Sequence, residues 1–598
     1  MVTRSFRCSL LLIAGVLPLG CRHTETALMC HARDHAVDAF DAAERSLPRT
    51  PFTTVADSQI AAPSEPVTDL DGVDYWELTL ADCIRIAVTQ SKIIRTLSGV
   101  EGGAVLTNPD GMASVFDRRI EQSGVLFGQR GQDAALADFD PVIELDALWG
   151  AAQNVQNSPF TAGGLAPGGV LDEDTTQVSL SLSQRLPAGG NLQLFQTFNY
   201  DANNAPSRLF ASAYNTNAQV LFRQPLLAGS GIDYNSVAGP LSGGVRGITG
   251  VSQGITIARI NESISKEEFR RSAADLLRDV EISYWQLHRE YAILAILKPH
   301  LARAKQSKKI LESRARQGER GTAVTDMASS INLMLTLESR IDDTTHAVLE
   351  REATLRKLMS VAPLDKTILK PCETPKMMEF GCDWSQLVTT AMLERSELRI
   401  RREQLRSLDC QICAARNVMR PSLDFVSSYS LNGFGDDVLG SGGSGNLGSA
   451  LGRQFAGQET GWNVGFQFEK QLGLRVAKSQ LTNLQFRRAR EAAVLKVQEE
   501  EIVSELASKL RRARRAWNAA TNLRARLEQA EKQVAAVTVL YKANGEGITR
   551  RSVLDAETVE SDVREQLETA MVDYNIAVTD LNHASCESLS LHALHIQD

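Results

Sequence analysis

The side chains that could carry chemistry in this 598-residue chain are few, and none forms a catalytic pattern. No Gly-Lys dipeptide occurs, which excludes a phosphate-binding P-loop, and no His-Glu-x-x-His sequence marks a metal site. His592 and His595 lie near the C-terminus without further ligands beside them in the sequence. We therefore expect no catalytic residue, no metal and no cofactor, and hence a protein that is not an enzyme.

Charged residues that follow two glycine-rich turns are the remaining candidates. The turn glycines are Gly318, Gly321, Gly545 and Gly547. A helix reverses most easily through a left-handed backbone, which glycine adopts at little cost. Asp326 follows the first turn, and Arg550, Arg551 and Asp555 follow the second. One interpretation is that both aspartates simply stabilise helix N-termini through the helix macrodipole. The other is that they interact with cations and with the arginines.

Each turn is expected to join a long helix to one about half as long. Apolar or small residues recur nearly every three or four positions from Ile502 to Tyr541, and a second periodic run extends from 553 to 586. A straight helix over 477–543 would be ~100 Å long at 1.5 Å per residue, too long for a globular core. The same spacing runs from Phe269 to Leu294, and a shorter helix is expected from 322 to about 360.

The two halves of the chain are similar in their order of elements. A shift of 226 residues places Gly321 on Gly547 and Leu355 on Leu581, while Ala87 in a short helix at 80–95 matches Ala391 in one at 384–416. Each half therefore contains a short helix, strands, a long helix, a turn and a half-length helix. We expect an internally duplicated mixed α/β protein with long antiparallel coiled-coil hairpins.

The domain boundaries follow from this repeat and from composition. The segments are a signal peptide at 1–21, a polar linker at 22–74, the first repeat at 75–360, an inter-repeat equatorial segment at 361–383, the second repeat at 384–586 and a short tail at 587–598. Arg4 and Arg7 precede an apolar run, which is the pattern of a secretory signal. Gly20 before Cys21 resembles a bacterial lipoprotein cleavage site, with Cys21 as the lipidated residue. The alternative is an ordinary cleaved signal.

Alternation of apolar and polar residues predicts strands in both halves. The clearest segments are 143–149, 178–183, 192–194, 218–224, 423–429 and 462–468. One apolar and one polar face per strand is the pattern of a transmembrane β-barrel with a wet lumen. In the last segment Trp462, Val464, Phe466 and Phe468 would face lipid, and Asn463, Gln467 and Glu469 would face water. The alternative is a soluble amphipathic sheet that covers a core. The net charge of −8 gives no reason to expect nucleic acid as a partner.

Several short motifs resemble the TolC-type outer-membrane efflux proteins (outer membrane factors). They are Leu78-Thr79-Leu80, Phe222-Arg223-Gln224-Pro225-Leu226-Leu227, Arg420-Pro421-Ser422-Leu423, and Gly547 followed by Val553-Leu554-Asp555-Ala556. The resemblance implies a homotrimer in which each chain gives four strands to one β-barrel, while the helices form a tunnel (an α-barrel) across the periplasm. An extra strand pair around Pro187 departs from that pattern.

The resemblance also implies a function and partners. The chain would be the outer-membrane exit duct of a tripartite efflux pump or a type I secretion system in a Gram-negative-type bacterium, passively conducting substrates from periplasm to exterior. It would contact a periplasmic adaptor, an inner-membrane transporter and outer-membrane lipid. The glycine turns would be the periplasmic tips, and Asp326, Asp555, Arg550 and Arg551 a gate there. The alternative is a structural or adhesive envelope protein with coiled-coil stalks.

Overall fold

The computed structural model describes residues 70–592 with internal gaps. The residues outside the description are 1–69, 71, 102–111, 126–129, 161–162, 209, 211, 240–253, 317–321, 362–366, 382, 440–447, 471, 544–548 and 593–598. Cys21, the four turn glycines and His595 therefore lie outside the described residues. None of the described helices is long and apolar enough to cross a membrane.

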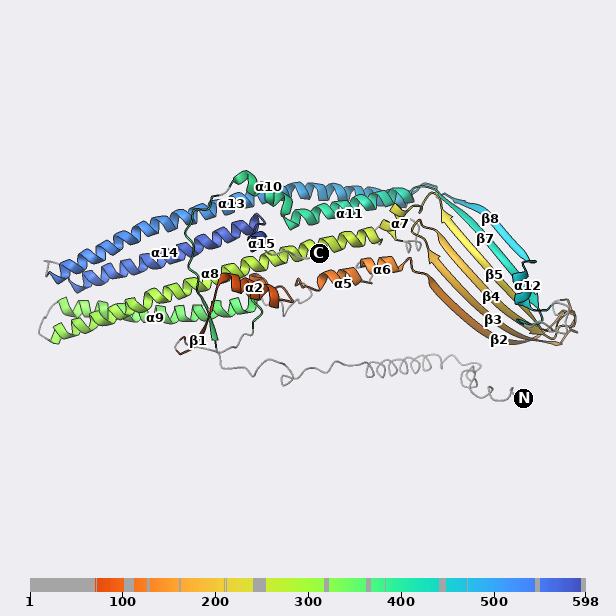
Figure 1. The fold of residues 1–598 in the computed structure, drawn as a ribbon, viewed down its shortest axis with the longest axis horizontal. Coiled ribbons are helices and arrows are strands. Elements are labelled where there is room, and N and C mark those ends of the chain that lie inside the picture. Colours follow the sequence, from red (N-terminus) through yellow and green to blue (C-terminus); the bar gives the residue numbers. More distant parts are fainter. Residues whose placement is uncertain are drawn as a thin grey trace, which may run out of the picture. The chain divides into compact units, whose positions relative to one another are not determined.

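Two helical hairpins dominate the fold (Figure 1). The first consists of α8 (Ile255–Arg316, 62 residues) and α9 (Thr322–Leu358, 37 residues). The second consists of α13 (Arg475–Lys542, 68 residues) and α14 (Arg550–Ala584, 35 residues). The prediction of a long helix followed by one of about half its length is confirmed in both halves. Helix α14 packs between α13 and α8, so the two hairpins form one layer.

Shorter helices pack along the two hairpins. They are α2 (Leu80–Gln90), α3 (Leu97–Glu101), α5 (Asp117–Ser123), α6 (Gln132–Ala137), α7 (Ile232–Ala238), α10 (Trp384–Glu394), α11 (Ser396–Val418) and α15 (Ser588–Leu591). Helices α5 and α6 pack on α8, and α11 packs on both α8 and α13. The expected single helix over 384–416 is wrong in one respect, because extended Arg395 separates α10 from α11.

The main hydrophobic core lies where α2, α8, α9 and α14 meet. Thr79 caps α2 by accepting a hydrogen bond from the amide of Asp82 at 3.1 Å, which starts the helix so that Ala87 points into this core. The buried Tyr284 of α8 donates its hydroxyl to the carbonyl of Leu78 at 3.2 Å. That carbonyl ends a strand that the sequence analysis did not predict.

This unexpected strand, β1 (Asp74–Leu78), pairs in parallel with β6 (Thr367–Pro371). The start of the first repeat therefore lies beside the inter-repeat segment. Buried Glu352 of α9 accepts a hydrogen bond from the amide of Leu369 at 3.3 Å and forms an ion pair with Arg356, which is 1% exposed. The buried Glu352–Arg356 pair thus helps to fix the two-stranded sheet to the helical layer, together with the hydroxyl of Tyr291, which donates to the carbonyl of Leu369 at 3.2 Å.

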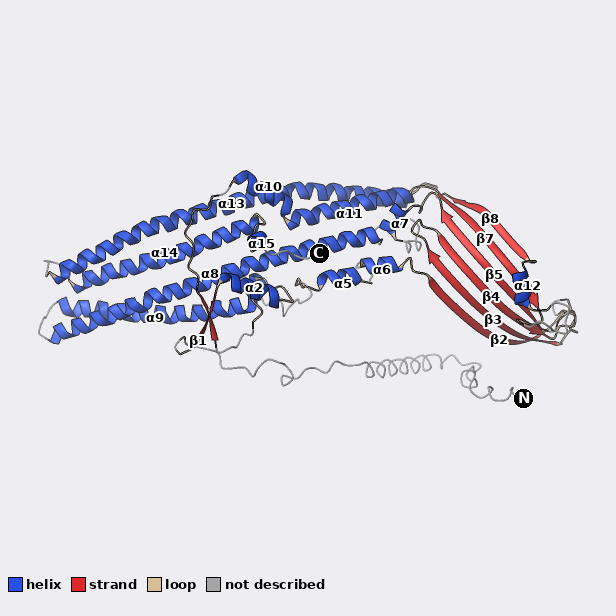
Figure 2. Cartoon of the chain, viewed as in Figure 1, coloured by secondary structure: helices blue, strands red, loops and turns tan. Residues whose placement is uncertain are grey.

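A second sheet of six described strands lies at the end of the long helices opposite the turns (Figure 2). Its strands, in spatial order, are β2 (Val142–Val155), β3 (Val170–Arg185), β4 (Asn191–Asn203), β5 (Ser212–Pro225), β7 (Ser422–Gly435) and β8 (Thr460–Glu469). All neighbours are antiparallel. All six predicted strands are confirmed. The four strands per chain that the resemblance implied are wrong, because the hairpin around Pro187 joins β3 and β4 inside the same sheet.

Candidate functional site

One face of the six-stranded sheet is apolar across every strand. Residues directly opposite each other on paired strands share a face. One such row crosses the whole sheet through Ile143, Leu182, Leu194, Val220, Tyr429 and Trp462. A core-covering sheet would bury this row, yet Ile143 is 72% exposed and Trp462 is 77% exposed. The apolar face is therefore open along both outer strands.

The opposite face of the same sheet is polar. One row on this face runs through Asp146, Ser179, Thr197, Asn217 and Asn432. Within it, Asn217 donates a side-chain hydrogen bond to the amide oxygen of Asn432 at 2.6 Å. An apolar face and a polar face back to back suit a wall between lipid and water.

The strand singled out from the sequence follows this division. Strand β8 exposes Trp462, Val464, Phe466 and Phe468, each more than half accessible. Phe466 lies beside Phe425 of β7, with ring centroids 5.6 Å apart. Asn463 and Gln467 pair with Ser428 and Asp424 on the polar face. The alternation predicts which side chains would contact lipid, and that assignment remains a prediction.

A short helix covers Gln196, which lies on the apolar face between Leu180 of β3 and Ala218 of β5. Helix α12 (Ala450–Ala456) packs on β5 and β7. Its Gln454, which is 0% exposed, exchanges two side-chain hydrogen bonds with Gln196 of β4, at 3.0 and 3.3 Å. Because each amide satisfies the other, Gln196 can occupy an apolar position. The sequence analysis did not predict this helix, although Ser449 caps it in the usual way by accepting a hydrogen bond from the amide of Gly452.

Near the turns, Arg550 connects the two hairpins. Its guanidinium donates from Nε and Nη2 to Oγ of Ser307 in α8, at 2.9 and 2.6 Å. The same guanidinium lies 5.8 Å from the ring centre of Tyr541 in α13, and Arg314 of α8 lies 5.5 Å from it. Ser307 and Tyr541 were not identified as functional from the sequence, because a serine and a tyrosine inside long helices carry no distinguishing pattern. We call Ser307, Arg314, Tyr541 and Arg550 the tip cluster.

The other charged candidates near the turns are not part of the tip cluster. Arg551 lies 3.9 Å from Asp555 on the solvent side of α14, with both side chains more than half exposed. Asp326 lies half-buried on α9. The macrodipole interpretation of the aspartates is not supported, because neither α9 nor α14 has an acidic residue in its first turn, where that effect is concentrated. Within a single copy, the four residues predicted as one gate therefore do not form one cluster. Arg550 belongs to the tip cluster, and the other three residues lie outside it.

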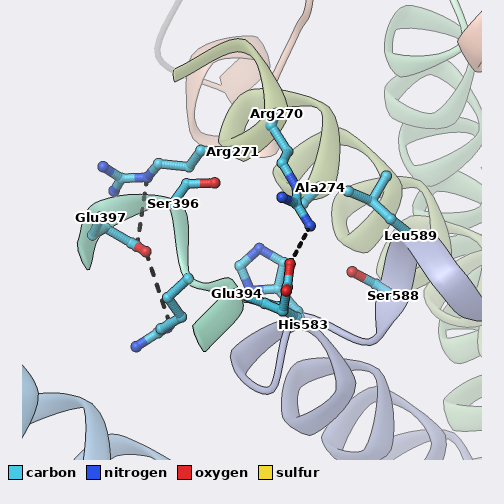
Figure 3. Close-up of a pocket in the computed structure, with 11 residues that line it drawn as sticks. Arg270, Arg271, Ala274, Glu394, Ser396, Glu397, His583, Ser588 and Leu589 are labelled. Atoms are coloured by element: carbon cyan, nitrogen blue, oxygen red, sulfur yellow. Dashed lines mark hydrogen bonds and ion pairs between the residues drawn. The ribbon is translucent and has the colours of Figure 1, made fainter. Parts of the chain in front are cut away.

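A junction of charged side chains links the two halves at mid-length (Figure 3). Arg270 of α8 points toward Glu394 of α10, 2.9 Å away, and Arg271 lies 3.8 Å from Glu397. His583 of α14 contacts Asp275 of α8 at 2.9 Å. The cavity that these residues line is only about 30 Å³, enough for one or two waters. Since the charges are paired and the space is small, the junction is structural.

Electrostatics at this junction favour the charged forms. Burial alone would raise the pKa of Asp275, but the hydrogen bond and charge of His583 outweigh it and lower that pKa. Burial likewise opposes ionisation of Glu505 in α13, yet the hydrogen bond from Arg395 at 2.7 Å lowers the pKa of that carboxyl. In contrast, burial raises the pKa of the Cys586 thiol to about 11. The described residues contain no cluster of three or more side chains that could hold a metal.

No protein-family model matches the sequence, and comparison with curated proteins gave no match. Solved structures do match. The outer-membrane channel OprN gives a TM-score of 0.53 at 12% identity, over 90% of this chain and 97% of that one. A membrane protein from Pseudomonas aeruginosa gives 0.52 at 15% identity, over 88% and 98%. The open state of the Neisseria gonorrhoeae MtrE outer membrane channel gives 0.50 at 14% identity, over 89% and 98%. The chain therefore has the fold of the TolC-type outer-membrane channels.

Proposed function

We propose that this protein is an outer-membrane exit duct that passively conducts substrates from the periplasm to the exterior, as part of a tripartite efflux pump or a type I secretion system. One observation carries the proposal. A sheet with one continuous apolar face and one polar face is joined directly to helices ~100 Å long. Such helices are long enough to extend far from a membrane, and such a sheet suits the membrane itself.

The membrane placement follows from the faces of β8. Trp462, Val464, Phe466 and Phe468 face lipid of the outer membrane, and Asn463, Gln467 and Glu469 face the lumen. Single cysteines along 462–469 should react alternately with a water-soluble thiol reagent in intact membranes. Uniform labelling along the strand would contradict the placement.

Conduction is the direct test of the duct. Purified protein reconstituted in a planar bilayer should give discrete conductance steps, since no reaction or energy source is required of the duct itself. A stalk or adhesive protein would give none. The duct acts as a homotrimer, in which three copies of the helical layer enclose the tunnel.

The tips of the hairpins meet a periplasmic adaptor, which connects the duct to an inner-membrane transporter. Gly318, Gly321, Gly545 and Gly547 form these tips. Photo-crosslinkers at Arg316 and Lys542, the last described residues of the two long helices, should capture a periplasmic protein. Capture of extracellular components alone would show that the orientation is reversed.

The tip cluster and the nearby acids form the gate. Arg550 holds the second hairpin on the first through Ser307, which keeps the entrance narrow. Asp555 with its neighbour Arg551, together with Asp326, provides rings of carboxylates around the three-fold axis that favour cations. Replacing Asp555 by Ala should reduce cation preference in single-channel recordings. Unchanged selectivity would show that these carboxylates are not part of the gate.

Internal duplication and lipidation complete the proposal. Ala87 and Leu355 share one core cluster, and their counterparts Ala391 and Leu581 share another. All four are at most 1% exposed, which supports two copies of one ancestral unit.

Lipidation of Cys21 would add an acyl anchor in the outer membrane, and Cys21→Ser should remove radiolabelled palmitate from the protein.

A further inference from the structure

We propose that strand β8 of one copy pairs with strand β2 of the next, and that all six strands of each copy belong to the wall of the pore. A trimer then has eighteen strands. This inference rests on the proposed function and goes beyond it, because it fixes the width of the barrel and the class of solute that can pass. The occupant of each sheet edge is a second copy of this chain.

Both edges of the described sheet are free and unprotected. Strands β2 and β8 stand at the two ends of the strand order. They are 14 and 10 residues long. Soluble proteins protect such edges with short strands, lysine, proline or bulges. Neither β2 nor β8 contains a lysine or a proline. Their backbone hydrogen-bonding groups are thus available for another strand.

Exposure within one apolar row points to a missing neighbour at each edge. Every residue of β2 is exposed. In the row that crosses the sheet, Ile143 at the β2 edge is 72% exposed, while Leu194 and Val220 on inner strands are 38% and 41% exposed. At the other edge, Trp462 is 77% exposed. Pairing of β8 with β2 of another copy would cover both edge residues as the inner ones are covered.

Strand direction and side-chain faces both permit this pairing. Strand β2 leaves the helical end of the sheet and β8 returns to α13 there, so the two edges run in opposite directions. A second copy placed in continuation of the sheet therefore pairs antiparallel. The apolar side chains of β2 and β8 lie on the same face of the sheet. The wall stays apolar on one side and polar on the other across the junction.

Six strands match the width of the helical layer of one copy. Beside the sheet, α8 lies between α5 and α6 on one side and α11 on the other, and α11 lies between α8 and α13, so the layer is four helices wide there. At a spacing of roughly 9 Å per helix this layer covers an arc of ~36 Å. Six strands spaced ~4.8 Å and tilted by ~40° cover ~38 Å. Four strands would cover only ~25 Å. The tunnel therefore continues into the barrel without narrowing.

The six strands need further copies to close. Single-chain membrane barrels have at least about eight strands. Three copies give eighteen strands and a backbone diameter of ~36 Å at the same spacing and tilt, whereas four strands per copy would give ~24 Å. Barrels of 16–18 strands leave an aqueous channel. The solute class is accordingly large hydrated molecules, wider than a barrel of twelve strands admits.

Paired cysteines on the polar faces test the pairing. Glu144→Cys or Asp146→Cys in β2 is combined with Asn463→Cys or Gln467→Cys in β8, which samples four successive registers. After oxidation of the full-length protein in membranes, at least one pair should give disulfide-linked species of up to three chains. The matched control combines Leu145→Cys with Gln467→Cys, which lie on opposite faces and should not link. Single-cysteine variants control for the native cysteines.

Two outcomes would overturn the inference. No disulfide from any of the four pairs would show that the edges do not meet. Linked species that stop at two chains would indicate a dimer, and hence a barrel of twelve strands rather than eighteen. The proposed function is tested separately by conductance. Conductance steps without disulfide-linked chains would refute the edge pairing alone. Disulfide-linked chains without conductance steps would refute the duct alone.

A deletion tests whether the additional hairpin is part of the wall. Removing residues 170–203 takes out β3 and β4 and leaves β2 and β5 in antiparallel order with matching faces. Maleimide-polyethylene glycols of graded size are then applied to a lumen-facing Ser428→Cys. The largest reactive polymer should be about one and a half times wider in the full-length protein than in the deletion variant. An equal cut-off in a folded deletion variant would exclude β3 and β4 from the wall. If that variant does not fold, the cysteine pairs decide.

Discussion

Arg550 of the second hairpin donates two hydrogen bonds to the single hydroxyl of Ser307 in the first, at 2.9 and 2.6 Å. Ser307 is 0% exposed, so the contact lies inside the helix packing. The next residue, Arg551, is more than half exposed and pairs only loosely with Asp555. Of these two adjacent arginines, Arg550 thus joins the hairpins, while Arg551 lies at the exposed surface.

Replacing Arg550 by Ala should loosen the hairpins near their turns. Hydrogen bonds to a charged group contribute roughly 1.5–3 kcal/mol, and partial exposure reduces this to about 1–2 kcal/mol. We expect a roughly 5–30-fold rise in the open-to-closed ratio of single-channel recordings. Arg551→Ala is the matched control and should leave the ratio near wild type. Equal effects of the two substitutions would contradict a specific role for Arg550.

Phe466 and Gln467 are neighbours on opposite faces of β8 and provide a paired test of membrane placement. Phe466→Arg should destabilise the folded protein in membranes by about 2–4 kcal/mol if Phe466 lies near the midplane of the bilayer. Gln467→Arg should have little effect, because its side chain faces water. Urea unfolding in lipid vesicles measures both. Similar losses in the two variants would contradict the assignment of faces.

Gln196 and Gln454 form a mutual amide pair on the apolar face, which predicts a non-additive result. Gln454→Leu alone leaves the amide oxygen of Gln196 without its donor and should cost about 1–3 kcal/mol. Replacing both by Leu removes the unsatisfied amide and should restore most of that loss. A double-mutant cycle in urea unfolding measures the coupling. Additive effects would show that α12 does not depend on this pair.

The Asp275–His583 contact predicts a dependence of stability on acid pH. The pKa of Asp275 is lowered from its ordinary value of 3.8 in the folded state, so its carboxylate stabilises the fold above that pH. The contribution is lost as pH falls from about 4 through the lowered folded-state pKa. Thermal unfolding followed by circular dichroism at pH 3–7 should show a smaller acid-induced fall for Asp275→Asn than for wild type. At pH 7 the variant should be less stable by about 1–2 kcal/mol.

Helix periodicity and strand alternation predict most of this fold because they are local properties. The helical spacing of apolar residues before Gly321 and the strand alternation around Trp462 both depend on residues a few positions apart. The helix and the strand that they predict are confirmed. The additional strand pair around Pro187 was visible for the same reason. The break at Arg395 was not, because Arg395 is held by Glu505, which is distant in the sequence.

The tip cluster could not be predicted for a similar reason. Ser307 and Arg550 are 243 residues apart, and Ser307 interrupts no pattern in its helix. Its role depends on the relative register of two hairpins, which the sequence of neither hairpin specifies alone. The sequence analysis identified Arg550 from its position after a turn, but with the carboxylates rather than Ser307 as its partners.

The pairing of β1 with β6 has a consequence for the order in which the chain can fold. Asp74 pairs with Thr367, so the partner strand of β1 is synthesised nearly 300 residues after β1 itself. Until residues 367–371 arrive, the backbone groups of β1 have no partner strand, and the carbonyl of Leu78 is held by Tyr284 alone. Strand β1 can therefore pair only after the strand region and the hairpin of the first repeat, which lie between β1 and β6 in the sequence, have been made. Even then the core of this repeat is incomplete, because Val572 and Ile576 of α14 are part of it.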